Sequence, residues 1–202
     1  MLVFKILAIC GMLSPIIYTL MWILGGFIVP EYSHLHKDIS SLFAVKAHRR
    51  WLFQSLIIVS SALLLIFFAG SHWAANNGEG LIVGSVLLII SAVMGLLIAC
   101  LFPLDEGGEP TGWRGKGHVI LVVGMGILQI VAMFFLFFRL RLIDGWKGLA
   151  IFTLVAAIVS LILVGVMSFF GGKPYMGLFE RLMASSYQIY YFGFALVVYL
   201  NN

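Results

Sequence analysis

The sequence predicts an all-α fold: a polytopic integral membrane protein whose residues 1–202 form a single bundle of six transmembrane helices. Two observations support this prediction. Of the 202 residues, 62% are hydrophobic and 10% are charged, and the mean hydropathy is +1.12, whereas a soluble domain is roughly 45–50% apolar and about 25% charged. The apolar residues also fall into six runs, each close to the length of about 20 residues that a helix needs to cross a bilayer core.

The six predicted spans follow one another along the whole chain. They cover residues 6–29, 51–70, 81–102, 118–138, 148–170 and 178–200. The first run follows Lys5, as the apolar core of a signal peptide would, but it is longer than the roughly 7–15 residues of such a core, so we expect a retained helix. No span carries a charge in its middle, which argues against an ion-coupled pump.

Six spans place loops one, three and five on one membrane face, and loops two and four with both termini on the other. Loops two and four are the short connections 71–80 and 139–147, while the segments 30–50, 103–117 and 171–177 are richer in Gly, Pro, His and charge. The odd-loop face has more Lys and Arg, which predicts that it is cytoplasmic. Its cations are Lys37, Lys46, Arg49, Arg50, Arg114, Lys116, Lys173 and Arg181, against Lys5, Arg139, Arg141 and Lys147 opposite.

Composition and motifs also exclude several partners. Twelve Lys and Arg against eight Asp and Glu give a net charge of +4, but the cations are too few and scattered to bind nucleic acid. The glycine-rich stretch 107–117 contains neither a dinucleotide-binding nor a Walker pattern, so no nucleotide is expected. Cys10 and Cys100 lie in apolar runs without ligand spacing, which is typical of small buried hydrophobic residues.

Ionisable and polar residues gather where the spans meet the odd-loop face, and four helix ends should bring them to a similar depth. Polar residues are ordinary at helix ends, so no single one of them indicates a site. Together they make the candidate site: Glu31, Ser33, His34, Asp38, Asp105, His118, Glu180 and Arg181.

Glu180 and Arg181 should lie inside the membrane interface, where a charged group needs a partner. We expect Asp105 or Glu31 to pair with Arg181, and His118 or His34 to pair with Glu180. Residues 38–45 resemble a capped, short amphipathic segment that lies along the interface or folds over the pocket.

Three functions fit these residues. The first is a polar pocket at one membrane face that binds a membrane lipid or other amphiphile, with Arg181 and His118 contacting an anionic head group. The alternative is an intramembrane hydrolase or transferase acting on lipid, in which His34, His118 and Asp105 or Glu180 hold a metal such as zinc and a metal-bound water or Ser33 attacks. A haem-b carrier using His34 and His118 is the third. The sequence leaves open whether there is catalysis, which ligand binds and which oligomer forms.

The chain resembles a family of bacterial and archaeal membrane proteins, domain of unknown function 998. The resemblance covers nearly the whole chain and depends on several short motifs in a fixed order. They are the segment 30–35 (PEYSHL), Asp38 with Ser40 or Ser41 and Leu42, the turn Phe102, Pro103 and Asp105, then His118, and last Gly177, Leu178, Phe179 and Arg181.

This resemblance implies a six-helix bundle in a prokaryotic plasma membrane, with a site at the odd-loop face and no established activity. The family usually has a second histidine before the fourth helix, where this chain has residues 113–117 (WRGKG), so the resemblance supports no two-histidine site there. The layout is distantly similar to the Frag1, DRAM and Sfk1 group, which is associated with membrane-lipid organisation.

Overall fold

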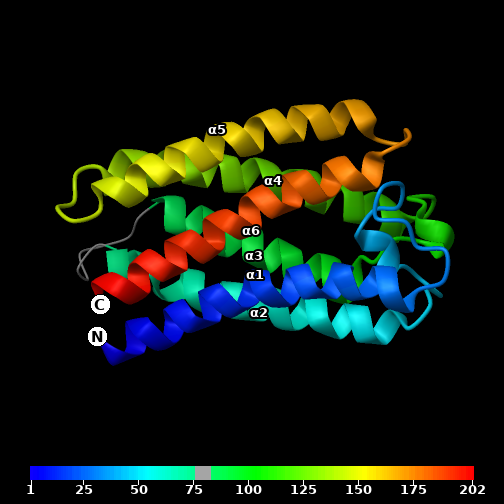
Figure 1. The fold of residues 1–202 in the computed structure, drawn as a ribbon, viewed down its shortest axis with the longest axis horizontal. Helices are drawn as coiled ribbons and strands as arrows, with labels where there is room; N and C mark the ends of the chain where they lie inside the picture. The colour runs from blue at the N-terminus through cyan, green and yellow to red at the C-terminus, as the bar shows by residue number, and fades with distance from the viewer. Residues whose placement is uncertain (76–82) are drawn as a thin grey trace.

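The computed structural model describes residues 1–75 and 83–202. These form six long α-helices: α1 (Leu2–Ile28), α2 (Arg50–Ala75), α3 (Val83–Leu101), α4 (Trp113–Leu140), α5 (Lys147–Phe170) and α6 (Met176–Asn201). Two short 3₁₀ helices, η1 (Ser40–Phe43) and η2 (Glu106–Gly108), lie in loops one and three. The helices run roughly parallel, with both termini at one end and loops one, three and five at the other (Figure 1). The predicted all-α helical bundle is confirmed.

The helices form a closed ring. Each packs against its neighbours in sequence, α6 also packs against α1, and a smaller contact joins α2 to α6. Within residues 1–75 and 83–202, five helices, α1 to α5, are long and apolar enough to cross a membrane. Helix α6 is as long, but polar residues lower its hydropathy; its outer face is apolar, as Ile189 at 63% exposure shows. The exact limits of the six predicted spans stay a prediction.

Several helices extend beyond the predicted spans. Residues 71–75 were expected in a connection, but they continue α2, and the Ser71 hydroxyl donates to the carbonyl of Phe68 one turn back. Helix α4 begins at Trp113 rather than 118. A helix does not have to end where the apolar run ends, because its first turns can lie in the polar interface. The rest of that connection and the predicted start of the third span, residues 76–82, lie outside the described residues.

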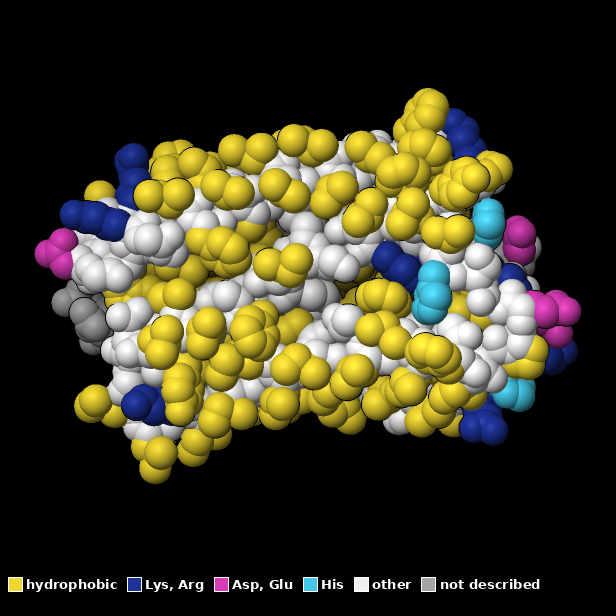
Figure 2. Space-filling view, viewed as in Figure 1, with side chains coloured by type: hydrophobic (Ala, Val, Ile, Leu, Met, Phe, Trp, Pro, Cys, Tyr) yellow, Lys and Arg dark blue, Asp and Glu magenta, His cyan; other side chains and the backbone are white. Residues whose placement is uncertain are grey.

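The surface has the polarity that a bilayer requires. Figure 2 shows hydrophobic side chains along the length of the molecule and charged side chains gathered at its two ends. At the odd-loop end, exposed Trp51 and Trp113 lie beneath the guanidinium groups of Arg50 and Arg114, 5.1 and 5.3 Å from the ring centroids. Exposed aromatic rings beside cations are typical of the membrane interface, so we expect the edge of the bilayer near this level.

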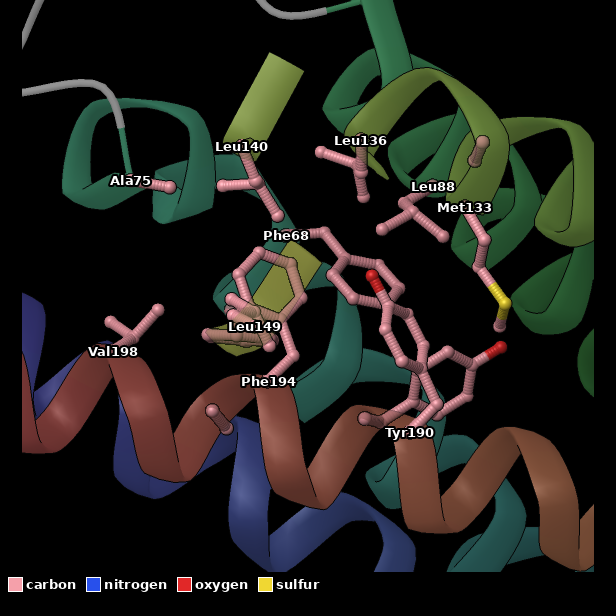
Figure 3. Close-up of a cluster of buried hydrophobic side chains, with 14 of the residues drawn as sticks. Phe68, Ala75, Leu88, Met133, Leu136, Leu140, Leu149, Tyr190, Phe194 and Val198 are labelled. Carbon is pink, nitrogen blue, oxygen red and sulfur yellow. The ribbon is translucent and has the colours of Figure 1, made fainter. Parts of the chain in front are cut away.

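Two hydrophobic clusters fill the ring. The larger lies toward the termini and joins residues from all the long helices; Figure 3 shows Phe68, Met133, Leu136, Tyr190 and Phe194 within it. The smaller lies at the odd-loop end and includes Ile39, Leu42 and Phe43 of loop one. Loop one is therefore part of the core at that end.

Candidate functional site

Residues 38–45 of loop one fold into the open end of the helix ring, and we call this segment the plug. Ile39, Leu42 and Phe43 are 1–3% exposed. Leu42 lies directly over Gly25 of α1, where a Cβ would come within 2.7 Å of the leucine methyl group. The sequence left two positions open for this segment, along the membrane interface or folded over the pocket. In the structure it is folded onto the bundle and does not lie along the interface.

Asp38 caps the plug. Its Oδ1 accepts a hydrogen bond from the backbone N–H of Ser41 at 3.1 Å, and the Ser41 hydroxyl donates to the Asp38 carbonyl at 2.7 Å. The Tyr32 hydroxyl donates to the same carbonyl at 3.0 Å. Burial raises the pKa of Asp38, and the hydrogen bonds from Ser41 oppose that rise. The carboxyl group therefore holds the local fold of the loop.

Arg181 binds loop one from α6. Its Nη1 donates to the carbonyls of His34, Lys37 and Gly177, each at 2.8 Å, and its Nη2 donates to the Tyr32 hydroxyl. Gly177 makes this approach possible, since a Cβ there would be 2.4 Å from the Lys37 carbonyl oxygen. Arg181 is 6% exposed, so its charge is satisfied inside the protein, by two carbonyls of loop one and by the Gly177 carbonyl of α6.

The predicted carboxylate partners of Arg181 are wrong. The ion pairs in residues 1–75 and 83–202 are Lys46 with Glu106 and Lys147 with Asp144. Asp105 instead accepts from the backbone N–H of Gly112 at 2.5 Å, at the start of α4. Glu31 is exposed at the end of α1. Loop carbonyls have no helical N–H partner, so they supply acceptors for the guanidinium without burying another charge.

Glu180 also binds the plug, and its predicted histidine partners are wrong. Its Oε2 accepts from the backbone N–H of Ile39 at 2.7 Å. The backbone N–H of Leu178 donates to the Leu35 carbonyl at 3.1 Å. Neighbouring residues on α6 therefore hold both sides of loop one, Arg181 through carbonyls before the plug and Glu180 through an N–H at its start.

His118 connects the plug to the other side of the ring. The Phe102 carbonyl can only accept, so His118 Nδ1 carries the proton of their 2.7 Å hydrogen bond, and Nε2 of the neutral ring accepts from the Ser40 hydroxyl at 3.0 Å. A further bond joins the loops, from the N–H of Val45 to the carbonyl of Leu104 at 2.9 Å. Helix α4, loop three and helix α6 thus all hold loop one.

The candidate metal ligands are not gathered into one group. Within the described part of the chain, no three His, Cys, Asp or Glu side chains are placed to hold a metal ion. His118 uses both ring nitrogens for protein groups, which also leaves neither available as a haem ligand, and Asp105 binds Gly112. Ser33 lies at the surface, where its hydroxyl is 2.9 Å from His36 Nδ1.

His34 lies at the seam between α1 and α6. Its ring packs edge-on against Trp22 and Tyr32, with centroids 5.6 and 5.4 Å away, and covers Gly26, where a Cβ would come within 2.0 Å of Nε2. Burial and the nearby Arg181 lower the pKa of His34, so the ring is neutral at neutral pH. The structure therefore brings His34, Asp38, Glu180 and Arg181 together, and leaves Glu31, Ser33 and Asp105 outside this group.

A depression of about 420 Å³ lies between loop one and loop three, at the outer side of the plug. Its apolar lining comes from Val29, Leu42, Ala44, Val45, Ala47 and Met176. Its polar lining comes from Tyr32, His36, Lys37, Asp38, Ser41, Lys46, His48, Glu106 and Glu109. Of these residues, the sequence pattern indicates only Asp38 as a site residue, because lysines in loops indicate membrane topology and nothing in the sequence places loop one beside loop three.

A family model matches residues 12–197, which include every residue that holds the plug, and its description is protein of unknown function (DUF998). No curated protein and no solved structure matches the chain. The match spans most of the 202 residues. The chain therefore belongs to the DUF998 family of proteins of unknown function.

Proposed function

We propose that this membrane protein binds a lipid or related amphiphile with an anionic head group, and that the head group occupies the depression between loops one and three. The observation that carries the proposal is the depression itself, whose volume of about 420 Å³ falls in the range of roughly 300–1,000 Å³ typical of ligand pockets. An amphiphile has a polar and an apolar part, and the depression has a polar and an apolar wall that can contact them.

The charges on the loop-one side of the depression favour an anionic group, while acidic Glu109, which has no ion pair among the described residues, lines the loop-three side. Lys46 is 2.7 Å from Glu106, so each neutralises the other. Asp38 is turned into the plug, where it accepts from Ser41. Lys37 has no ion pair among the described residues and stands beside the imidazoles of His36 and His48. Lysine and imidazole N–H groups are suitable donors to phosphate oxygens.

This proposal differs from the sequence-based one in the head-group ligands. Arg181 and His118 already bind protein groups, so we assign their first role to holding loop one. Val29 and Met176, at the ends of α1 and α6, line the depression where a lipid in the bilayer could approach. The head group would then be bound at the surface, and the acyl chains of the lipid would lie along the α1–α6 seam.

The experiment is native mass spectrometry of the detergent-solubilised protein titrated with phosphatidylglycerol. The Lys37→Ala variant should bind this lipid several-fold more weakly than the unchanged protein. Lys173→Ala is the matched control, because Lys173 is a cation at the same end that lies over the Phe169 ring, 3.7 Å from its centroid, outside the depression. Equal losses in the two variants, or none in either, would contradict the proposal.

A further inference from the structure

The depression presents charged side chains of both signs. Lys37 lies on its loop-one side and Glu109 on its loop-three side, and neither forms an ion pair among the described residues. Lys46 and Glu106 also line the depression, but they are 2.7 Å apart and neutralise each other. Asp38 is turned into the plug, where it accepts a backbone N–H. A lysine on one wall and a glutamate on the other therefore remain to bind a ligand.

The fold of loop three determines where Glu109 lies. Gly108, directly before it, has a φ of 82°, which residues with a side chain rarely adopt. Gly108 packs against loop one, since a Cβ there would be 3.4 Å from the Ser41 Cβ. Pro110, directly after it, packs against α4, where a Cβ on Gly115 would be 2.6 Å from the Pro110 Cα. The backbone of Glu109 is therefore held on both sides, at the wall of the depression.

The carboxylate of Glu109 restricts which head groups fit. A carboxylate accepts hydrogen bonds and does not donate them. A phosphate group satisfies Lys37 but is repelled by Glu109, because both groups are negative. A head group with a hydroxyl or ammonium group beyond its phosphate can instead donate to Glu109. Such a head group would lie across the depression, with its phosphate at loop one and its donor at loop three.

We infer that Glu109 accepts a hydrogen bond from a hydroxyl or ammonium group at the far end of the lipid head group. The ligand is then a phospholipid whose head group carries a hydrogen-bond donor beyond its phosphate. This inference rests on the proposed function, which places the phosphate beside Lys37. Glu109 thereby determines specificity, since it distinguishes between lipids that carry the same phosphate.

The test compares lipids with the same acyl chains by native mass spectrometry of the detergent-solubilised protein. The first pair is phosphatidylglycerol and phosphatidylmethanol, which carry the same charge, although only the first has hydroxyl groups. The second pair is phosphatidylethanolamine and phosphatidylcholine, because the quaternary ammonium of choline has no N–H. The net effect of one hydrogen bond corresponds to a preference of about two- to tenfold. We expect this preference for the donor-bearing lipid in at least one pair, which then identifies the donor.

The variants test whether Glu109 causes the preference. Glu109→Ala should make the affinities within the pair equal, because the acceptor is gone. Glu31→Asn is the control and should keep the preference, because Glu31 is exposed outside the depression. Asparagine tolerates the left-handed φ of 58° at that position. Each preference is a ratio measured within one variant, so a general loss of stability does not change it.

The outcomes separate this inference from the proposed function. Equal affinities within both pairs for the unchanged protein, or a preference that persists in Glu109→Ala, would overturn the role of Glu109. In either case a loss of phosphatidylmethanol binding in Lys37→Ala would leave the proposed function standing, because that lipid has the phosphate without the donor. Absence of binding for all four lipids would overturn both.

Discussion

Replacing Arg181 with methionine should release loop one from the bundle. The change keeps most of the side-chain volume but removes the donors to the carbonyls of His34 and Lys37, which have no other hydrogen bond among the described residues. A buried acceptor left without a donor costs about 1–3 kcal/mol. Two such acceptors predict a loss of about 2–6 kcal/mol in the free energy that holds the loop closed, before any entry of water.

Hydrogen exchange measured by mass spectrometry can check this loss. Backbone amides of residues 35–45 should exchange much faster in Arg181→Met, while those in the middle of α5 should keep their protection, because the helix ring does not depend on Arg181. Arg114→Met is the control, since Arg114 is exposed and lies over the Trp113 ring. Unchanged exchange in residues 35–45, or equal acceleration in the control, would refute the assignment of Arg181 as the residue that holds the loop.

Other changes test the same network. Gly177→Ala should lower the melting temperature in detergent and accelerate loop exchange, because its Cβ would lie 2.4 Å from the Lys37 carbonyl oxygen; unchanged melting would show that this approach is not tight. Ser40→Ala should weaken the plug by about 0.5–1.5 kcal/mol through loss of its bond to His118, and exchange rates equal to those of the unchanged protein would count against that link. Burial raises the pKa of Asp38 in the folded protein, so the folded state holds this proton more tightly, and loop protection should fall as the pH rises above the ordinary carboxyl range. Asp38→Asn should flatten that pH dependence, and a persistent slope would assign it to another group. Cysteines introduced in the odd loops, at Ser33, Glu109 and Lys173, should react with an impermeant reagent from one membrane face, and a cysteine at Asp144 should react from the other. Reaction of the odd-loop cysteines from different faces would contradict the topology.

The fold followed from the sequence because its determinants are local. Six apolar runs with polar connections specify six helices, since a helix satisfies its own backbone hydrogen bonds in lipid. The gathering of Asp38, Glu180 and Arg181 at the odd-loop end follows from the same runs, because successive helices cross in alternate directions and this brings the odd loops to one face. The depth of Arg181 also follows from its position in the last apolar run.

The contacts within the site could not be predicted in the same way. Arg181 binds loop carbonyls and Glu180 binds a loop N–H, and every residue has a backbone carbonyl, so no side-chain pattern indicates such a partner. Opposite charge alone therefore indicates Asp105 and Glu31, neither of which forms an ion pair with Arg181 among the described residues. The depression escaped prediction for a related reason. Lys37 and Glu106 lie far apart in the chain, and their loops are brought together by the hydrogen bond from Val45 to Leu104 and by the ion pair of Lys46 with Glu106.

The central claim, that a lipid head group occupies the depression at the odd-loop end, can be tested most directly by photo-crosslinking. The unchanged protein in a nanodisc would be labelled with phosphatidylglycerol carrying a photoreactive group on its head group, and the labelled peptides would be identified by mass spectrometry. Labelling should concentrate on loop one around Lys37 and on the start of α6 around Met176, and excess unlabelled phosphatidylglycerol should suppress it. Labelling spread evenly over the ends of all six helices, or insensitive to competitor, would contradict it.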